Sequence, residues 1–247
     1  MAMAMAMAMA MAAKHASKAN EMEELSLPEI LTTYQGEQGK AYLRQRQGAV
    51  SEHVQELRAS LFRDLADRQY TILDFGCGTG ATLSRLDAAA HIGIEIGEAA
   101  SLLAQSAGIE VHRTLQEITS ASVDVAISFH AIEHVENPLS IVKELARVVK
   151  PGGQLRLIVP GENPHDPRQA VWLPNNDKHL YTWTPLLFGN LAEAAGLQSI
   201  ETRIAPMVTR SRLVRFLHPV PRLSAWAHRR VATRQNSFNV ILNARVK

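Results

Sequence analysis

The sequence is poor in cysteine and in long apolar runs. Cys77 is the only cysteine among 247 residues, which excludes an internal disulfide framework and suits a reducing compartment. No apolar run reaches the roughly 20 residues that a membrane-spanning helix needs. We therefore expect a cytoplasmic protein, long enough for one α/β domain with a sizeable core.

Acidic residues are missing from the C-terminal part of the chain. All 24 aspartates and glutamates precede residue 202, whereas ten of the 26 lysines and arginines follow it. A basic stretch of this kind favours an anionic partner. Nucleic acid is not the partner we expect, because these arginines lack the interleaved aromatic residues on which bases stack.

Within this stretch, apolar residues recur at three- or four-residue spacing between residues 207 and 235, which predicts a basic helical insertion. We favour the interpretation that its arginines form the solvated face of helices packed on the body. The alternative is a docking patch for a phosphate-bearing or lipid-linked sugar acceptor, with peripheral membrane contact.

A glycine-rich turn follows a short apolar segment in the first half of the chain. Residues 70–75 predict a buried strand, and residues 81–89 after the turn have helical character. Three glycines stand at alternate positions of the turn, namely Gly76, Gly78 and Gly80. Glycines let a ligand approach bare N–H groups at the start of a helix. The spacing is G-x-G-x-G, with Asp74 two residues earlier, and not the dinucleotide fingerprint G-x-G-x-x-G. This pattern resembles motif I of the class I S-adenosylmethionine (SAM)-dependent methyltransferases.

Later segments fit the same family in order. Residues 123–129 form an almost continuous apolar strand that is followed by Glu133-His134-Val135, and a helix is predicted to start at Asn137-Pro138. A Lys-Pro-Gly-Gly stop at residues 150–153 and a strand at residues 154–160 come next. The resemblance implies an α/β fold: a Rossmann-like, doubly wound, seven-stranded and mostly parallel sheet with helices on both faces. Its last strand, at residues 236–246, would lie antiparallel beside the fifth.

The resemblance also suggests a domain organisation. Residues 1–20 begin with Met-Ala repeats and are expected to be a disordered, low-complexity extension and not an export signal, because no basic residue precedes the apolar run. Residues 21–69 are expected to form an N-terminal helical lid over the cofactor. Residues 70–247 would be the SAM-binding core, with the basic insertion at about 207–235.

The implied cofactor is S-adenosyl-L-methionine. Glu95 ends the second predicted strand, where an acid accepts hydrogen bonds from both ribose hydroxyls. Many family members have an aspartate after the third strand to contact adenine, but residues 113–116 here are Arg-Thr-Leu-Gln, which leaves adenine recognition to the region of Leu115 and Gln116. The predicted cofactor-binding residues are Asp74, Gly76, Cys77, Gly78, Gly80, Glu95, Ile96, Leu115, Gln116, Ser128, Phe129 and His130.

The segment His130-x-x-Glu133-His134 supplies the candidate catalytic groups. It matches a zinc-protease pattern, but that motif needs a helix, whereas these residues follow a strand and precede a helix start. In the family fold this position lies beside the methyl donor. His134 is our candidate base, because an imidazole titrates near neutral pH, and Glu133 would orient it. Two alternatives stay open: hydrogen bonds that only brace the loop, and a divalent ion as in the ubiquinone-type O-methyltransferases. We rank the ion below the others and assign no metal ligand.

The acceptor side is predicted between the fifth strand and the next helix. Residues 161–182 form a long connection with several prolines and many polar or aromatic side chains, and connections of this length are usually functional. His179 in this connection is a second candidate base, or else a structural histidine. We predict O-methylation of a small-molecule or sugar-type acceptor. The alternatives are an RNA or protein methyltransferase that uses the Arg-rich region, and a catalytically silent SAM-fold regulatory subunit.

Overall fold

The computed structural model describes residues 36–46, 52–161, 179–207 and 237–247, together with Leu223, Trp226, Ala227, Arg230 and Val231. For residues 38, 42 and 44–46 it describes the backbone alone. The predicted N-terminal extension, residues 162–178 of the predicted acceptor connection and most of the predicted basic insertion lie outside these ranges. None of the described helices is long and apolar enough to cross a membrane.

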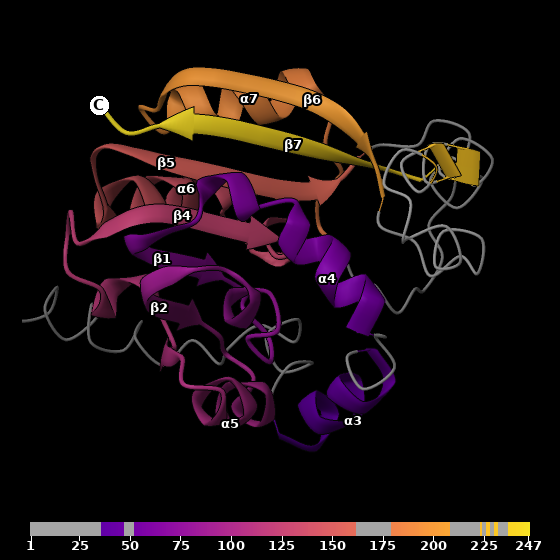
Figure 1. The fold of residues 1–247 in the computed structure, drawn as a ribbon. Helices are drawn as coiled ribbons and strands as arrows, with labels where there is room; N and C mark the ends of the chain where they lie inside the picture. The colour runs from indigo at the N-terminus through magenta and orange to yellow at the C-terminus, as the bar shows by residue number, and fades with distance from the viewer. Residues whose placement is uncertain are drawn as a thin grey trace, which may run out of the picture.

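One seven-stranded sheet organises the described part of the chain (Figure 1). Its strands are β1 Asp67–Phe75, β2 Ala88–Ile94, β3 Glu110–His112, β4 Val123–Phe129, β5 Val149–Pro160, β6 Gln198–Pro206 and β7 Phe238–Arg245. The order across the sheet is β3-β2-β1-β4-β5-β7-β6, with β7 antiparallel to both β5 and β6 and the other pairs parallel. The predicted doubly wound sheet with an antiparallel last strand is confirmed.

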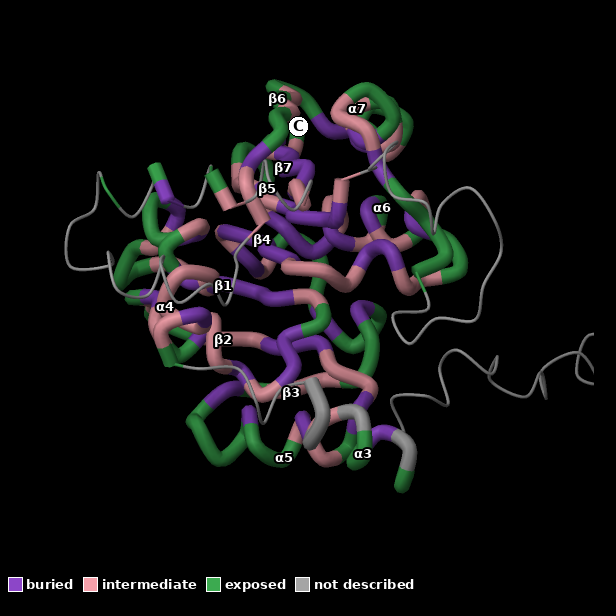
Figure 2. Tube along the Cα trace, turned by 90° about the vertical axis from the view of Figure 1, so that its right-hand side faces the viewer, coloured by how far each residue is buried: buried purple, intermediate pink, exposed green. Residues whose placement is uncertain are grey.

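Helices cover both faces of the sheet, as predicted. The helices are α3 Gly36–Arg46, α4 Glu52–Ser60, α5 Glu98–Ser106, α6 Pro138–Val148 and α7 Pro185–Ala194. Four 3-10 turns accompany them: η1 Arg63–Leu65, η2 Leu83–Arg85, η3 Leu115–Glu117 and η4 Ile132–His134. Helices α6 and α7 pack on one face with η3, whereas α4, η1, η2 and α5 pack on the other, so that the buried strands lie between two outer layers (Figure 2).

Successive side chains of a strand point to opposite faces of the sheet, so each strand contributes to a hydrophobic core on either face. In β5, Leu155, Leu157 and Val159 join the cluster under α6 and α7, while Ile158 points to the α4 side. Central strands buried on both faces read as continuous apolar runs, which explains why the sequence of β4 was recognisable as a strand. The caps were also recognisable, because the side chains of Asn137 and Thr184 accept hydrogen bonds from the first turns of α6 and α7.

The helix predicted at residues 81–89 is wrong. The connection contains only the short turn η2, because β2 already begins at Ala88, which pairs with Asp67 of β1. Too few residues remain for a full crossover helix. This face of the sheet is instead covered by buried side chains from two segments, the one from α4 to η1 and the connection between β1 and β2. These side chains are Ala59, Phe62, Leu65, Leu83 and Leu86. The strand predicted from residue 154 likewise begins earlier, at Val149, because Val149 pairs with Val123 of β4.

Candidate functional site

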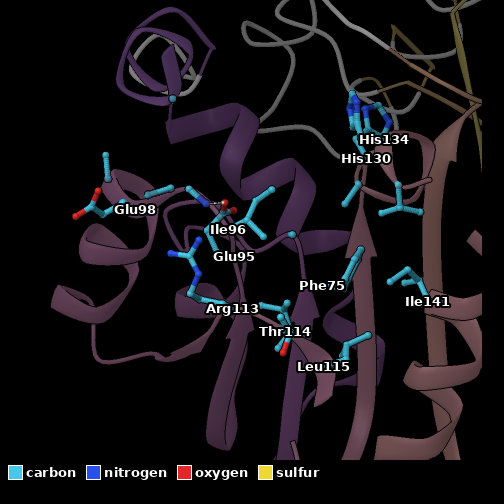
Figure 3. A pocket seen from close by; sticks show the side chains of 18 of the residues that line it. Phe75, Glu95, Ile96, Glu98, Arg113, Thr114, Leu115, His130, His134 and Ile141 are labelled. Atoms are coloured by element: carbon cyan, nitrogen blue, oxygen red, sulfur yellow. Dashed lines mark hydrogen bonds between the residues drawn. The ribbon is translucent and has the colours of Figure 1, made fainter. Parts of the chain in front are cut away.

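A cavity of about 640 Å³ opens at the carboxyl ends of the parallel strands (Figure 3). Strand β1 lies between β2 and β4 there, and ligands of open α/β sheets bind at such a switch point in strand order. The ends of β1, β2, β3 and β4 contribute to the wall, together with α3, α5 and the start of α6. Its floor and sides are mainly apolar, with Phe75, Leu115 and Ile141 among the lining residues.

The glycine turn forms one side of this cavity and needs its glycines. Gly76 lines the cavity with a φ of +78°, and a Cβ built on it would lie 2.5 Å from the Cβ of Ala131. Gly80 has a φ of +74° and would clash with Ile109. Other residues are strained at positive φ and would not fit this close packing. The turn therefore brings the backbone against the cavity as the motif predicts.

Glu95 connects the turn to the end of β2. Its carboxylate accepts hydrogen bonds from the backbone N–H groups of Gly78 at 2.9 Å and Gly97 at 2.6 Å. Burial raises the pKa of Glu95, and these N–H groups oppose the rise. Glu95 also lines the cavity, and its contact with the ribose hydroxyls stays a prediction.

Asp74 lies behind the same turn and is almost fully buried. Burial and the neighbouring charge of Glu95 raise its pKa well above the usual range, and its Oδ1 has no hydrogen-bond partner among the described residues. A buried acceptor without a donor is unusual in a folded protein and fits a site that a ligand or an ordered water completes. This unpaired acceptor, the glycine turn and the Glu95 carboxylate fit the amino-acid and ribose parts of SAM.

Half of the predicted cofactor-binding residues line the cavity, namely Gly76, Glu95, Ile96, Leu115, Gln116 and His130. The remaining six are not among its lining residues, namely Asp74, Cys77, Gly78, Gly80, Ser128 and Phe129. Ser128, for example, is fully buried and donates a hydrogen bond to the carbonyl of Phe75 at 2.8 Å. Burial raises the pKa of the Cys77 thiol, as expected for a structural cysteine. Direct contact of any of these twelve residues with the cofactor stays a prediction.

His130 forms the wall after β4 in an unusual backbone conformation, with a φ of +54°. Its Nε2 lies 2.9 Å from the Oδ1 of Asn239 and donates to it, because an amide oxygen only accepts. Burial lowers the pKa of His130 to about 4, and the positive charges of Arg58, His179 and His134 act in the same direction. His130 is therefore neutral at physiological pH.

The three predicted catalytic residues lie together. Glu133 is completely buried, and the Nε2 atoms of His134 and His179 both lie 3.9 Å from its Oε1. The two imidazole rings meet edge to face at 4.8 Å. His134 lines the cavity, whereas His179 does not and approaches Glu133 from the segment before α7. That segment is held by a hydrogen bond of 2.9 Å from the Leu180 N–H to the Glu133 carbonyl.

Glu133 is the acid of this cluster and has no solvent-accessible surface. Neither carboxyl oxygen has a hydrogen-bond partner in the described part of the chain, and burial raises its pKa to about 8. The carboxyl group is therefore mostly protonated at neutral pH. One ligand atom each from Glu133, His134 and His179 lies within 4.8 Å of the others, so these residues are also able to hold a metal ion.

Several cavity residues were missed by sequence reasoning. Helix α3 contributes Lys40 and Leu43, and α5 contributes its first turn and Leu102. The lid expected at residues 21–69 includes α3, but no local pattern singles out Lys40 or Leu43. The first turn of α5 was recognisable in principle, since a helix start directly after the acid of β2 is a place where ligands bind. Arg113 was noted only as a departure from the family pattern.

The fold, together with the glycine turn and Glu95 at the cavity, defines a class I SAM-dependent methyltransferase. The profile of the methyltransferase domain family matches residues 42–202, which is well over half of the chain. The chain therefore belongs to this family, and its cofactor is SAM.

Curated relatives include the ubiquinone biosynthesis O-methyltransferase of Hahella chejuensis, 35% identical over 105 residues, which cover 38% of this chain and 44% of the relative. The same enzyme of Dinoroseobacter shibae is 28% identical over 178 residues, which cover 61% of this chain and 70% of the relative. The first of these matches thus spans less than half the length of the relative. A solved SAM-dependent methyltransferase from Thermotoga maritima superposes with a TM-score of 0.61 at 15% identity, over 89% of this chain and all of that one.

Proposed function

We propose that this protein transfers a methyl group from SAM to an oxygen of a small-molecule or sugar-type acceptor. The observation that carries the proposal is the placement of His134 in the same cavity wall as Gly76 and Glu95. A candidate base and the cofactor cradle thereby share one enclosed space. The O-methyltransferase names of the relatives support oxygen as the target atom.

In this proposal, the sulfonium of SAM supplies the methyl group to a nucleophilic oxygen. The cavity aligns that oxygen, and alignment of two reactants lowers a barrier by up to ~7–11 kcal/mol. An imidazole nitrogen of His134 takes the hydroxyl proton. The buried Glu133 carboxyl, 3.9 Å away, positions the ring, and its ionised form would stabilise the imidazolium once it forms.

A metal-assisted variant has one observation in its favour, the clustering of Glu133, His134 and His179. Two imidazoles and a carboxylate suit transition metals such as zinc, manganese or iron. An ion held there would lower the pKa of a bound acceptor hydroxyl in place of a free His134 base. Chelation separates the two mechanisms, since only the metal-assisted reaction would be abolished by EDTA and restored by a divalent cation.

The experiment that tests the proposal is an acceptor screen with SAM, using phenols and nucleotide sugars and measuring S-adenosylhomocysteine (SAH) release. With an accepted substrate, we expect His134→Gln to lower kcat by roughly 10²–10⁴-fold, the usual contribution of a positioned base. Its affinity for SAH should stay within about threefold of the wild type. If kcat of the variant also stays within about threefold, His134 only braces the loop and the assigned base is wrong.

A further inference from the structure

Arg113 stands at the end of β3 in the cavity wall, and nothing in the proposed reaction uses it. Figure 3 shows its side chain extending from the strand end towards Glu95 and Ile96, along the part of the cavity next to the ribose-binding carboxylate. Its guanidinium makes no hydrogen bond or ion pair with any residue that the structure describes. Its guanidinium offers five N–H donors and no acceptor, so it is suited to a ligand that brings acceptors into this cavity.

The backbone that carries Arg113 is held in place on both sides. The N–H groups of Arg113 and Thr114 donate to Oε1 of Glu117 at 3.2 and 2.9 Å. On the other side, the guanidinium of Arg147 donates to the carbonyls of Leu115 at 2.8 Å and Ile118 at 3.0 Å. The polar groups of this segment are thus satisfied inside the protein, while the Arg113 side chain remains available.

Many family members have an aspartate after the third strand that contacts adenine, whereas this wall has the guanidinium of Arg113. Glu117, the acid of the turn η3 that follows Arg113, is already engaged by Thr114 and His112 and does not line the cavity. With the ribose on Glu95, the base of the cofactor lies towards the end of β3. A purine presents ring nitrogens that accept hydrogen bonds and an aromatic face, and a planar guanidinium complements both. Ile96 and Leu115 add apolar contact on either side.

We propose that Arg113 binds the purine ring of the cofactor through its guanidinium and determines the base specificity of the site. Recognition then depends on the ring nitrogens and the ring face, and not on the 6-amino group that a carboxylate would bind. Replacing that amino group by an oxo group leaves acceptors for Arg113. The protein should therefore tolerate a hypoxanthine base, which a carboxylate reader would reject.

The alternative is that Gln116 recognises the base. It lines the same cavity, and its amide is able to accept from the 6-amino group while donating to a ring nitrogen. Under this alternative the protein would discriminate strongly against hypoxanthine, and the discrimination would disappear in Gln116→Ala.

The test is calorimetric binding of SAH and S-inosylhomocysteine, which needs no acceptor and no turnover. We expect the wild type to bind the two within about threefold of each other, and Arg113→Ala to weaken both by at least fivefold. Arg113→Asp, which restores a carboxylate, should prefer SAH by about tenfold. The matched control is Arg68→Asp, an exposed arginine at the amino end of β1 and thus at the opposite edge of the sheet; it should bind like the wild type.

Three results would overturn the proposal. Binding of both ligands by Arg113→Ala within twofold of the wild type would show that the guanidinium is only solvated. A wild-type preference for SAH above tenfold that is lost in Gln116→Ala would assign the base to Gln116. If the folded wild type binds neither ligand, the cofactor assignment itself fails, and this result is distinct from a negative acceptor screen. Arg113 is exposed, so its variants should melt at the wild-type temperature.

Discussion

At the residue scale, burial sets the protonation state of two ionisable groups in the site. Burial raises the pKa of Glu133 to about 8 and lowers that of His130 to about 4, so that both are neutral at pH 7. The sequence identified these residues because they follow a strand at the ligand-binding edge. It did not predict their charge, because their burial depends on the segment before α7 and on Asn239 of β7, which are distant in the sequence.

The first prediction concerns Glu133→Gln and the pH dependence of stability. An acid whose folded pKa of about 8 exceeds the ordinary value of 4.5 contributes fully at low pH, and its contribution is lost as the pH rises through 8. The free energy of unfolding of the wild type should therefore fall relative to the variant between about pH 5 and pH 9. The expected difference is up to ~4 kcal/mol. Urea titrations at several pH values measure it, and parallel curves for the two proteins would contradict the assigned protonation state.

At the element scale, predictions succeeded where local pattern decides the structure. Strand β4 was predicted with both of its ends, since it is a continuous apolar run, and the starts of α6 and α7 follow from a cap residue before a proline. They failed where pairing partners decide it: residues 81–89 and 149–153 were assigned without knowledge of the strands beside them. The lid expected at residues 21–69 includes α3, but no local pattern predicts that α3 packs against α5.

Helix α3 gives a prediction at this scale. Lys40 and Leu43 line the cavity, while the buried core of the described residues begins only at Val54 of α4. Deleting residues 1–46 should therefore weaken SAH binding at least tenfold and lower the melting temperature by no more than a few degrees. Calorimetry and thermal unfolding measure the two effects. Unchanged SAH affinity in the truncated protein would contradict the proposed role of this segment as a lid.

At the scale of the whole molecule, the carboxyl edge of the sheet holds both the cavity and the strand ends that flank residues 208–236. Because β7 is antiparallel, β6 ends and β7 begins at this edge, and the Met207 N–H donates to the Ser237 carbonyl at 3.2 Å. The described helical residues between these strands lie beyond this edge, near the ends of β6 and β7 (Figure 1). Trp226 is half exposed there, with the guanidinium of Arg230 over its ring.

The alternative to a solvated arginine face is that the basic segment docks on an anionic acceptor or membrane surface. Basic residues near an anionic bilayer contribute about 1 kcal/mol each. If the segment is such a docking patch, the protein should cosediment with vesicles rich in phosphatidylglycerol and be released when Arg212, Arg215, Arg229 and Arg230 are replaced by glutamate. Neutral phosphatidylcholine vesicles and Arg68→Glu are the controls. Equal sedimentation of the wild type and the fourfold variant would leave a solvated arginine face as the explanation.

The central claim is that the cavity at the carboxyl edge binds SAM through the glycine turn and Glu95. The most direct measurement is calorimetric binding of SAM and SAH to the wild type, to Gly78→Val combined with Glu95→Ala, and to Glu110→Ala as a control on the exposed β3. The account predicts micromolar binding to the wild type and the control, with SAH tighter than SAM, and loss of both in the double variant. A folded wild type that binds neither ligand, or a double variant that binds them as well as the wild type, would contradict it.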